Sequence, residues 1–161
     1  MLARPRDRNK SKSLQLLIGH ADTVWPKGTL DTMPMDEEKG KIMGPGVFDM
    51  KAGLTQMFFA IKTIQDLGLE MEVTPIILVN GDEEIGSRES TTVIKRLAKI
   101  SERAYVLEPP LGLDGKLKTT RKGLGRFTVT IKGVAAHAGL DPGKGASAIL
   151  ELSHVVQKLF A

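Results

Sequence analysis

The segment Ser13–Val24, SLQLLIGHADTV, runs from a short apolar stretch directly into His20 and Asp22. The apolar part, which ends at Gly19, predicts a buried strand with both polar residues at its carboxyl end. Residues 73–79 form a second, continuous apolar run with β-branched side chains, typical of a strand buried on both faces. The two runs therefore predict two buried strands.

Two helical patterns alternate with the predicted strands. Residues 54–67 carry apolar side chains at helical spacing, Asp49 stands in the position of an N-cap, and Gly68 ends the pattern. A second helix is expected from Arg88 to about Ile100, before a third short strand at 104–107. The order strand, helix, strand, helix, strand predicts an α/β layer with parallel strands.

The segments around this layer have weaker patterns. The residues from Trp25 to Gly46 are rich in Pro, Gly and charge, and we expect a loop. Apolar side chains alternate with polar ones over 126–132, which predicts a half-exposed strand. A last helix is expected from about Ala146 to Phe160, and we place a domain boundary near Thr119–Gly125.

Composition limits the class of protein. A chain of 161 residues with 41% hydrophobic and 26% charged residues is ordinary for a soluble globular protein. The longest apolar runs are too short to span a bilayer, so we expect no membrane partner. The net charge of +4 comes from the first twelve residues, which we expect to be a frayed, solvated terminus. We expect no nucleic-acid binding, although a basic tail leaves that alternative, or a membrane surface, open.

Polar side chains follow each predicted strand, where ligands bind in open α/β sheets. His20 and Asp22 follow the first strand, Glu83 and Glu84 the second, and Glu108 the third, while Asp49 opens the first helix. The chain has no cysteine, and one imidazole with several carboxylates suits Zn²⁺ or another divalent ion. Each residue taken alone also fits an ordinary surface histidine, helix cap or solvated loop, so these residues by themselves leave both interpretations open.

Five sequence strings carry a resemblance to a known family: GHADTVWP (19–26), GPGVFDMKAG (44–53), NGDEEIGS (80–87), LEP (107–109) and GVAAHAG (133–139). In this order they resemble the family of glutamate carboxypeptidase, acetylornithine deacetylase, succinyl-diaminopimelate desuccinylase and aminoacylase. The family consists of dinuclear zinc hydrolases that cleave amide bonds next to a carboxylate. The resemblance implies a partial mixed or parallel sheet flanked by helices, as in zinc exopeptidases.

The resemblance also implies a division into domains and a set of metal ligands. Residues 1–120 would form part of the catalytic domain, and residues 121–161 would begin an α+β lid or dimerisation domain. His20 and Glu108 match ligands of the first zinc, and Glu84 matches a ligand of the second. Asp49 matches the carboxylate that bridges both ions, and the family usually has a cis peptide bond directly after it.

Three further residues match roles other than metal ligation. Asp22 matches the carboxylate that orients His20, and we count it with the catalytic residues. Glu83 matches the general base that takes a proton from a metal-activated water and later hands it to the leaving amine. His137 matches a lid-domain histidine that contacts the substrate carbonyl oxygen across a dimer, whereas His154 has no expected role.

The resemblance implies two zinc ions in a complete enzyme, with Co²⁺ and Mn²⁺ as alternatives. It further implies a peptide or N-acyl amino acid as substrate and a homodimer when complete. The absence of cysteine fits a cytoplasmic location, which we expect. In the family, the last ligand of the second zinc is a histidine from a later segment. The two histidines that follow Glu108 here, His137 and His154, do not replace it. We therefore expect an interior fragment that binds at most one zinc well, is poorly soluble and is nearly inactive. The alternative is a truncated, non-catalytic relative that acts only as a binding module.

Overall fold

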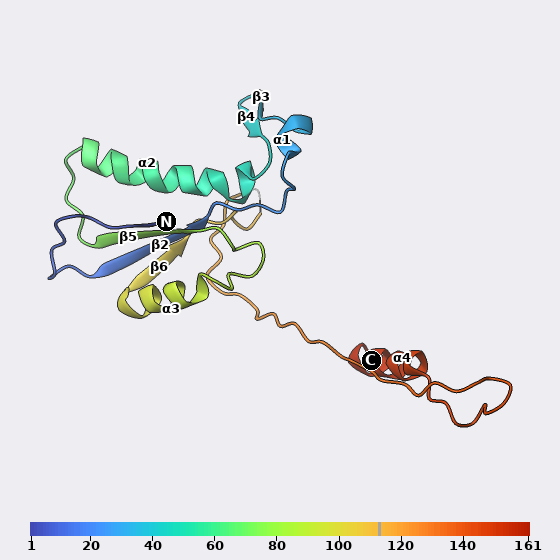
Figure 1. Cartoon of the computed structure of the whole chain (residues 1–161). Coiled ribbons are helices and arrows are strands. Elements are labelled where there is room, and N and C mark those ends of the chain that lie inside the picture. The colour runs from blue at the N-terminus through green and yellow to red at the C-terminus, as the bar shows by residue number, and fades with distance from the viewer. Residues whose placement is uncertain (113) are drawn as a thin grey trace. The chain divides into compact units, whose positions relative to one another are not determined.

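A four-stranded sheet organises the first part of the chain (Figure 1). Its strand order is β1-β5-β2-β6, and its members are β1 Leu2–Ala3, β2 Leu14–His20, β5 Thr74–Asn80 and β6 Arg103–Val106. Strand β2 pairs in parallel with both β5 and β6, whereas β1 pairs with β5 antiparallel. The mixed sheet confirms the expected α/β class.

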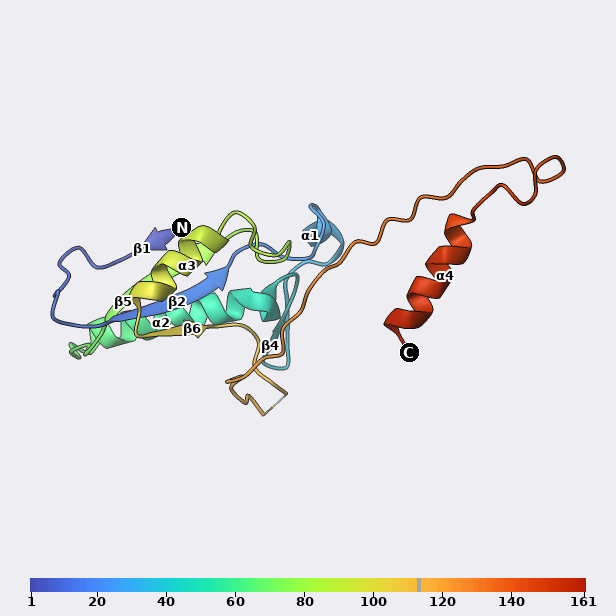
Figure 2. The same cartoon turned by 90° about the horizontal axis from the view of Figure 1, so that it is seen from below.

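The computed structural model describes residues 1–112 and 114–161, which form two compact units, Met1–Lys118 and Thr119–Ala161. In the first unit, helix α2 (Ala52–Asp66) covers one face of the sheet and α3 (Thr91–Ile100) covers the other (Figures 1 and 2). The connection from β2 to β5 and the connection from β5 to β6 run in opposite directions across the sheet. Because crossovers between parallel strands are right-handed, opposite directions place the two helices on opposite faces.

The core between the sheet and α3 follows from the period-two alternation of the strands. Leu14 and Leu16 of β2 and Ile76 and Leu78 of β5 are buried against Leu97 of α3. Leu16 is opposite Ile76 in the parallel register, so the two strands present their apolar side chains to α3 as one surface. This alignment brings the carboxyl ends of β2 and β5 to the same edge of the sheet.

Helix α2 ends where the sequence predicts. Gly68 has φ +63°, the left-handed conformation that glycine adopts without strain. The N–H of Gly68 donates to Gln65 O, and the N–H of Leu69 donates to Ile64 O, both at 3.0 Å. These two bonds form a Schellman motif, which satisfies carbonyl groups that the last helical turn leaves free.

Three expectations for the first unit were wrong. The N-terminus is not frayed, because β1 pairs with β5 and the Lys12 ammonium lies 2.6 Å from Glu70 Oε1. The expected loop contains a short helix, α1 (Thr29–Thr32), and a hairpin of β3 (Asp36–Glu38) and β4 (Lys41–Met43). Helix α3 begins at Thr91 rather than near Arg88, because hydrogen bonds to Asp82 hold the preceding residues in turns.

The second unit contains helix α4 (Ala148–Leu159), somewhat shorter than predicted. Ser147 caps it, since its hydroxyl accepts a hydrogen bond from Leu150 N at 3.2 Å. The expected strand at 126–132 is wrong: the segment is extended but pairs with no other strand of the described residues. Phe127 on this segment is 92% exposed. Alternating apolar and polar side chains predict which side of an extended segment is apolar. A β-strand also requires a neighbouring strand to which its backbone can hydrogen-bond.

Candidate metal centre

His20 is the last residue of β2, and its side chain is only 1% exposed. Ring atom Nδ1 lies 3.0 Å from the backbone oxygen of Asp22 and 3.4 Å from Asp22 Oδ1. Both neighbours are hydrogen-bond acceptors, so Nδ1 carries the hydrogen of the neutral ring. With its hydrogen on Nδ1, a neutral ring has its lone pair on Nε2, whereas a protonated ring has a hydrogen there as well.

Two carboxylates face that nitrogen. Nε2 of His20 lies 3.1 Å from Asp49 Oδ1 and 3.4 Å from Glu108 Oε1. A lone pair directed at two carboxylate oxygens is repulsive unless a proton or another cation lies among the three groups. This arrangement is the geometry of a cation site.

The pKa values of His20 and Glu108 in the metal-free centre reflect the same crowding of charged groups. Burial on its own lowers the pKa of His20, but the backbone bond to Asp22 and the charge of Glu108 outweigh it and raise the pKa. Burial, together with the hydrogen bond and like charge of Asp49, raises the pKa of Glu108 to about 7. The centre thus retains protons where isolated carboxyl groups have lost them.

The structure brings together all the residues expected to hold metal. Ligand atoms of His20, Glu83 and Glu108 lie within 4.8 Å of one another, and so do those of His20, Asp49 and Glu84. The two groups share His20, so one cluster of four carboxylates surrounds a single imidazole. A nitrogen donor with oxygen donors and no sulfur fits a divalent ion such as Zn²⁺.

Asp22 lies behind this cluster and connects two of its elements. Its Oδ2 accepts the backbone N–H of Glu84 at 3.0 Å, and its backbone oxygen accepts from His20. Among the residues that the structure describes, Asp22 Oδ1 is buried without a hydrogen-bond partner. The backbone oxygen of Asp22 thus holds the imidazole in one orientation, and its carboxylate fixes the start of the Glu84 loop.

Asp49 does not cap a helix, contrary to the sequence prediction. It lies at a kink in the segment η1 (Val47–Lys51), where its φ of −120° and ψ of 102° are not helical. The Asp49–Met50 peptide bond is cis, as the resemblance implied. The Met50 side chain is fully buried, and its Sδ accepts the backbone N–H of His20 at 3.1 Å. The kinked backbone therefore buries Met50 and leaves the Asp49 carboxylate facing His20.

Two glycines allow these elements to approach. A Cβ on Gly19 would lie 2.5 Å from Leu54 Cδ2 and 2.9 Å from Met50 Cε, and a Cβ on Gly53 would overlap the backbone oxygen of Leu107. Gly19 therefore makes room beneath His20, and Gly53 brings the start of α2 against the segment that carries Glu108. Our sequence analysis gave neither glycine a role, although both lie inside the quoted strings.

Asp82 is a further residue that the sequence analysis did not single out. Its Oδ2 accepts the backbone N–H groups of Glu89 at 2.8 Å and Ser90 at 3.0 Å. Asn80 donates to its Oδ1 at 3.2 Å. Hydrogen bonds from Ser90 hold the pKa of Asp82 below its ordinary value. Asp82 thus stabilises the loop that presents Glu83 and Glu84, and its position beside them in NGDEEIGS was the available signal.

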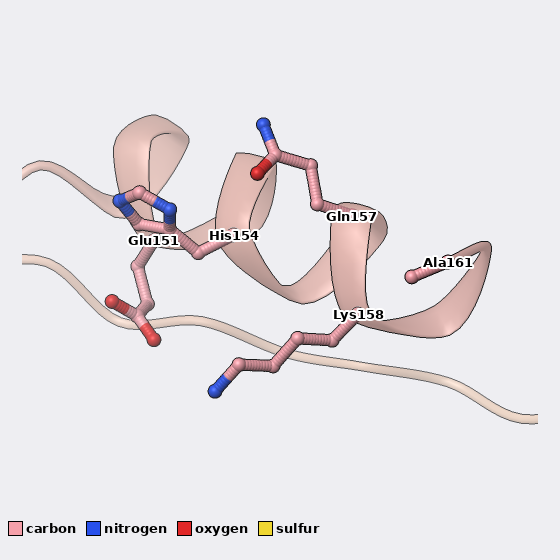
Figure 3. Close-up of a pocket in the computed structure, with 5 residues that line it drawn as sticks. All are labelled: Glu151, His154, Gln157, Lys158 and Ala161. Atoms are coloured by element: carbon pink, nitrogen blue, oxygen red, sulfur yellow. The ribbon is translucent and has the colours of Figure 1, made fainter.

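The other two histidines belong to the second unit. His137 is exposed in a loop, and His154 lies on α4. A shallow hollow lies along one side of α4, lined by Glu151, His154, Gln157, Lys158 and Ala161 (Figure 3). Its lining comes from α4 and from Ala161, which follows the helix. His154 gains no role from it.

The sequence is similar to those of several known proteins. The sequence profile described as Peptidase family M20/M25/M40 matches residues 16–156. Carboxypeptidase G2 of Pseudomonas sp. (strain RS-16) is 36% identical over 141 residues, covering 88% of this chain and 34% of that protein. Acetylornithine deacetylase of Shigella sonnei (strain Ss046) is 30% identical over 148 residues, covering 86% and 35%. The chain spans about a third of the length of these relatives.

Solved structures show the same fold. Aminopeptidase PepT of Bacillus cereus ATCC 10987 superposes with a TM-score of 0.65 at 22% identity, covering 98% of this chain and 42% of that one. The M20 family metallo-carboxypeptidase Sso-CP2 of Sulfolobus solfataricus superposes with a TM-score of 0.55 at 25% identity, covering 71% and 27%. Within the described residues, no helix is both long and apolar enough to cross a membrane.

Proposed function

The chain belongs to peptidase family M20/M25/M40, and from this membership we propose that its carboxylate cluster is the zinc centre of an amide hydrolase. The reaction is hydrolysis of an amide or peptide bond adjacent to a carboxylate. The observation that carries the proposal is the contact of His20 Nε2 with Asp49 and Glu108, with Nδ1 turned to Asp22. These positions provide a buried imidazole lone pair surrounded by anionic oxygens.

We assign the metal ligands from this geometry and from the resemblance. His20, Asp49 and Glu108 would hold a first ion, and Glu84, together with Asp49, would hold a second. A bound Zn²⁺ would lower the pKa of a water molecule and polarise the scissile carbonyl. Co²⁺ and Mn²⁺ are alternatives, because nitrogen and carboxylate ligands also suit them.

Glu83 is the general base in this proposal. One of its oxygens lies within 4.8 Å of ligand atoms of both His20 and Glu108, and its side chain is exposed to solvent. It takes a proton from water and hands it to the leaving amine. Asp22 supports the same step by keeping His20 in the tautomer whose lone pair faces the centre.

We infer the substrate class from two relatives with different activities. One is a carboxypeptidase and another is a deacetylase, so we propose a peptide or an N-acyl amino acid with a free carboxylate. Residues 1–120 form the catalytic part, and residues 121–161 begin a lid domain in which His137 contacts the substrate. The working enzyme is a cytoplasmic homodimer in this proposal.

The test measures zinc content and zinc-dependent hydrolysis of dipeptides and N-acetyl amino acids. We expect the 161-residue chain to bind one zinc ion well and to hydrolyse substrate slowly. Failure to bind zinc, or hydrolysis that a chelator does not affect, would overturn the proposal. Zinc binding without any turnover in a form that also supplies the missing histidine of the second site would favour the alternative of a non-catalytic binding module.

A pair of matched variants isolates Glu83. In any form of the protein with measurable turnover, Glu83→Gln should retain zinc and lose nearly all activity, about 100-fold or more. Glu72→Gln changes an exposed glutamate of the same unit and should retain both properties. Retained turnover in Glu83→Gln would remove Glu83 from the mechanism while leaving the metal centre intact.

A further inference from the structure

Asn80 is the last residue of β5, and its buried side-chain amide is held through its nitrogen. Nδ2 donates toward three oxygens, at 3.2 Å from Asp82 Oδ1, 3.3 Å from Ser87 Oγ and 3.1 Å from Ser90 Oγ. We call these three acceptors the amide clamp. The amide oxygen of Asn80 is also buried, but it has no hydrogen-bond partner among the described residues. The carbonyl side of the amide is therefore left unsatisfied.

The residue that follows Asn80 is a glycine that the backbone does not require. Gly81 is not among the glycines with positive φ, and a Cβ at this position would meet nothing within 4 Å. Within the described part of the chain, its N–H donates to no backbone oxygen. Asn80 is thus followed by a backbone nitrogen that is sterically open and free of a competing hydrogen bond.

We propose that Asn80–Gly81 is a deamidation site of this chain and that the amide clamp restrains the reaction. The nitrogen of Gly81 forms a bond to Cγ of Asn80, and the bond from Cγ to Nδ2 breaks. Nδ2 leaves as ammonia with the proton of the Gly81 amide, and a cyclic imide remains. Water then opens the imide at Cγ to give aspartate, or at the main-chain carbonyl carbon to give isoaspartate.

The clamp opposes this reaction because attack requires the Asn80 side chain to turn toward Gly81. Such a turn breaks the hydrogen bonds of Nδ2, and each of them has a free-energy cost when it is lost inside the protein. Local opening of the loop removes the same bonds, so deamidation should follow the opening of this loop. The fold therefore slows the reaction without removing the reactive pair.

Both products would disturb the loop that carries Glu83 and Glu84. Aspartate at position 80 would place a carboxylate opposite Asp82 Oδ1 where an N–H donor now lies, and like charges repel. Isoaspartate lengthens the main chain by one methylene directly before the loop. The backbone oxygen of Asn80 also accepts the N–H of Ala21 at 2.9 Å, which connects the loop to the end of β2. Any effect on zinc rests on the proposed function, whereas the reaction itself does not.

A purely structural role for Asn80 is the main alternative. In that case the amide only stabilises the turns before α3, and the glycine that follows has no chemical consequence. Asn9 provides an internal comparison, because it is the other asparagine of the chain, is exposed and is followed by the larger Lys10. Once the chain is unfolded, the two asparagines differ chiefly in the residue that follows them.

Mass spectrometry of the 161-residue chain, incubated at mildly alkaline pH with and without urea, tests the proposal. Trypsin releases residues 63–88 as one peptide, in which conversion of Asn80 is counted, and an isoaspartyl methyltransferase labels the isoaspartate product. We expect Asn80 to react about 10-fold or more faster in urea than in the folded chain, because the folded chain must first open. In urea it should also react faster than Asn9. No conversion in urea, or equal rates with and without urea, would overturn the proposal.

Matched variants separate the clamp from the reactive pair. Ser90→Ala removes one acceptor and should speed the reaction of the folded chain about 2- to 10-fold. Gly81→Ala adds a Cβ for which there is room and should slow the reaction in both states. Ser101→Ala is the control, since its hydroxyl bonds to Leu97 O at the other end of α3. A wild-type rate in Ser90→Ala would refute the clamp, and a wild-type rate in Gly81→Ala would refute attack by the Gly81 nitrogen.

Amide exchange measures the effect of the product on the loop. Asn80→Asp should speed exchange of the Glu89 and Ser90 amides, which donate to Asp82, about 2- to 10-fold. Asn9→Asp adds the same charge at an exposed position and should change neither amide. Equal exchange in Asn80→Asp and wild type would refute the effect on the loop. None of these measurements uses zinc, so a chain that deamidates as expected but binds no zinc would overturn the metal centre alone.

Discussion

The backbone N–H of Glu84 donates a hydrogen bond to Asp22 Oδ2 at 3.0 Å, which ties the loop after β5 to the end of β2. The same Asp22 accepts from the imidazole of His20. One residue therefore positions two proposed metal ligands, an imidazole and a carboxylate, that are 64 positions apart in the chain. This link makes the geometry of the centre sensitive to a side chain that need not touch the metal.

Removal of this carboxylate should weaken zinc binding. We expect Asp22→Ala to lower zinc affinity about 10-fold, because the Glu84 N–H loses its acceptor and the negative charge beside His20 Nδ1 is removed, while the backbone oxygen of residue 22 still accepts from His20. Asp22→Asn should lose less, since an amide oxygen can still accept the Glu84 N–H. Competition with a chromophoric chelator measures the affinities, and Asp7→Ala provides an exposed control. Unchanged affinity in Asp22→Ala would refute the positioning role.

Zinc binding should release protons at mildly acidic pH. The pKa of His20 is raised and that of Glu108 is raised to about 7, so both groups hold protons at pH about 6 that a cation must displace. Affinity should therefore rise as the pH increases through 7 and then level off. Calorimetry in buffers of different ionisation enthalpy counts the protons. Release that does not fall between pH about 6 and about 8 would contradict the pKa shifts.

The metal-free chain should become less stable as these groups ionise. Glu108 has a higher pKa in the folded chain, about 7, than its ordinary value of 4.5. Its contribution to stability is therefore fully present below pH about 4.5 and is lost as the pH rises through about 7. Glu108→Gln cannot ionise, so at pH about 8 it should be more stable than wild type by about 1–3 kcal/mol. Urea unfolding without metal measures the difference.

Two results would oppose this prediction. Equal stability at pH about 8 would show that the charged Glu108 costs nothing in the fold. A gain that persists at pH about 4 would show that the amide stabilises through contacts rather than through loss of charge. With zinc present the order should reverse, because Glu108→Gln removes a ligand of the first ion.

Gly53 should not tolerate a side chain. Its Cβ would overlap the backbone oxygen of Leu107, and backbone atoms cannot move aside as a flexible side chain can. We expect Gly53→Ala to lower the free energy of unfolding by about 1–3 kcal/mol, although alanine is the better helix former. Gly81→Ala is the matched control, because a Cβ there meets nothing within 4 Å. A stabilised Gly53→Ala would show that α2 does not need this close approach.

Much of the fold could be predicted from local patterns. The strands at 14–20 and 74–80 and helix α2 agree with prediction because burial repeats along each segment with a fixed period. The strand at 126–132 failed for the complementary reason: its pattern was correct for a strand, but pairing depends on a distant partner. The pairing of β1 with β5 was missed because two residues carry no periodicity.

The sequence by itself determined which residue types follow which strands, and therefore that an imidazole and several carboxylates gather at one edge of the sheet. The periodic spacing of apolar residues and the order of the elements along the chain are sufficient to predict this gathering, because parallel strands have their carboxyl ends at the same edge of a sheet. Tertiary structure alone decided that His20 Nε2 lies 3.1 Å from Asp49 and that Asp49 leaves the helix-cap position. Those outcomes depend on Met50 filling the space above Gly19, and such contacts between distant residues leave no periodic trace in the sequence.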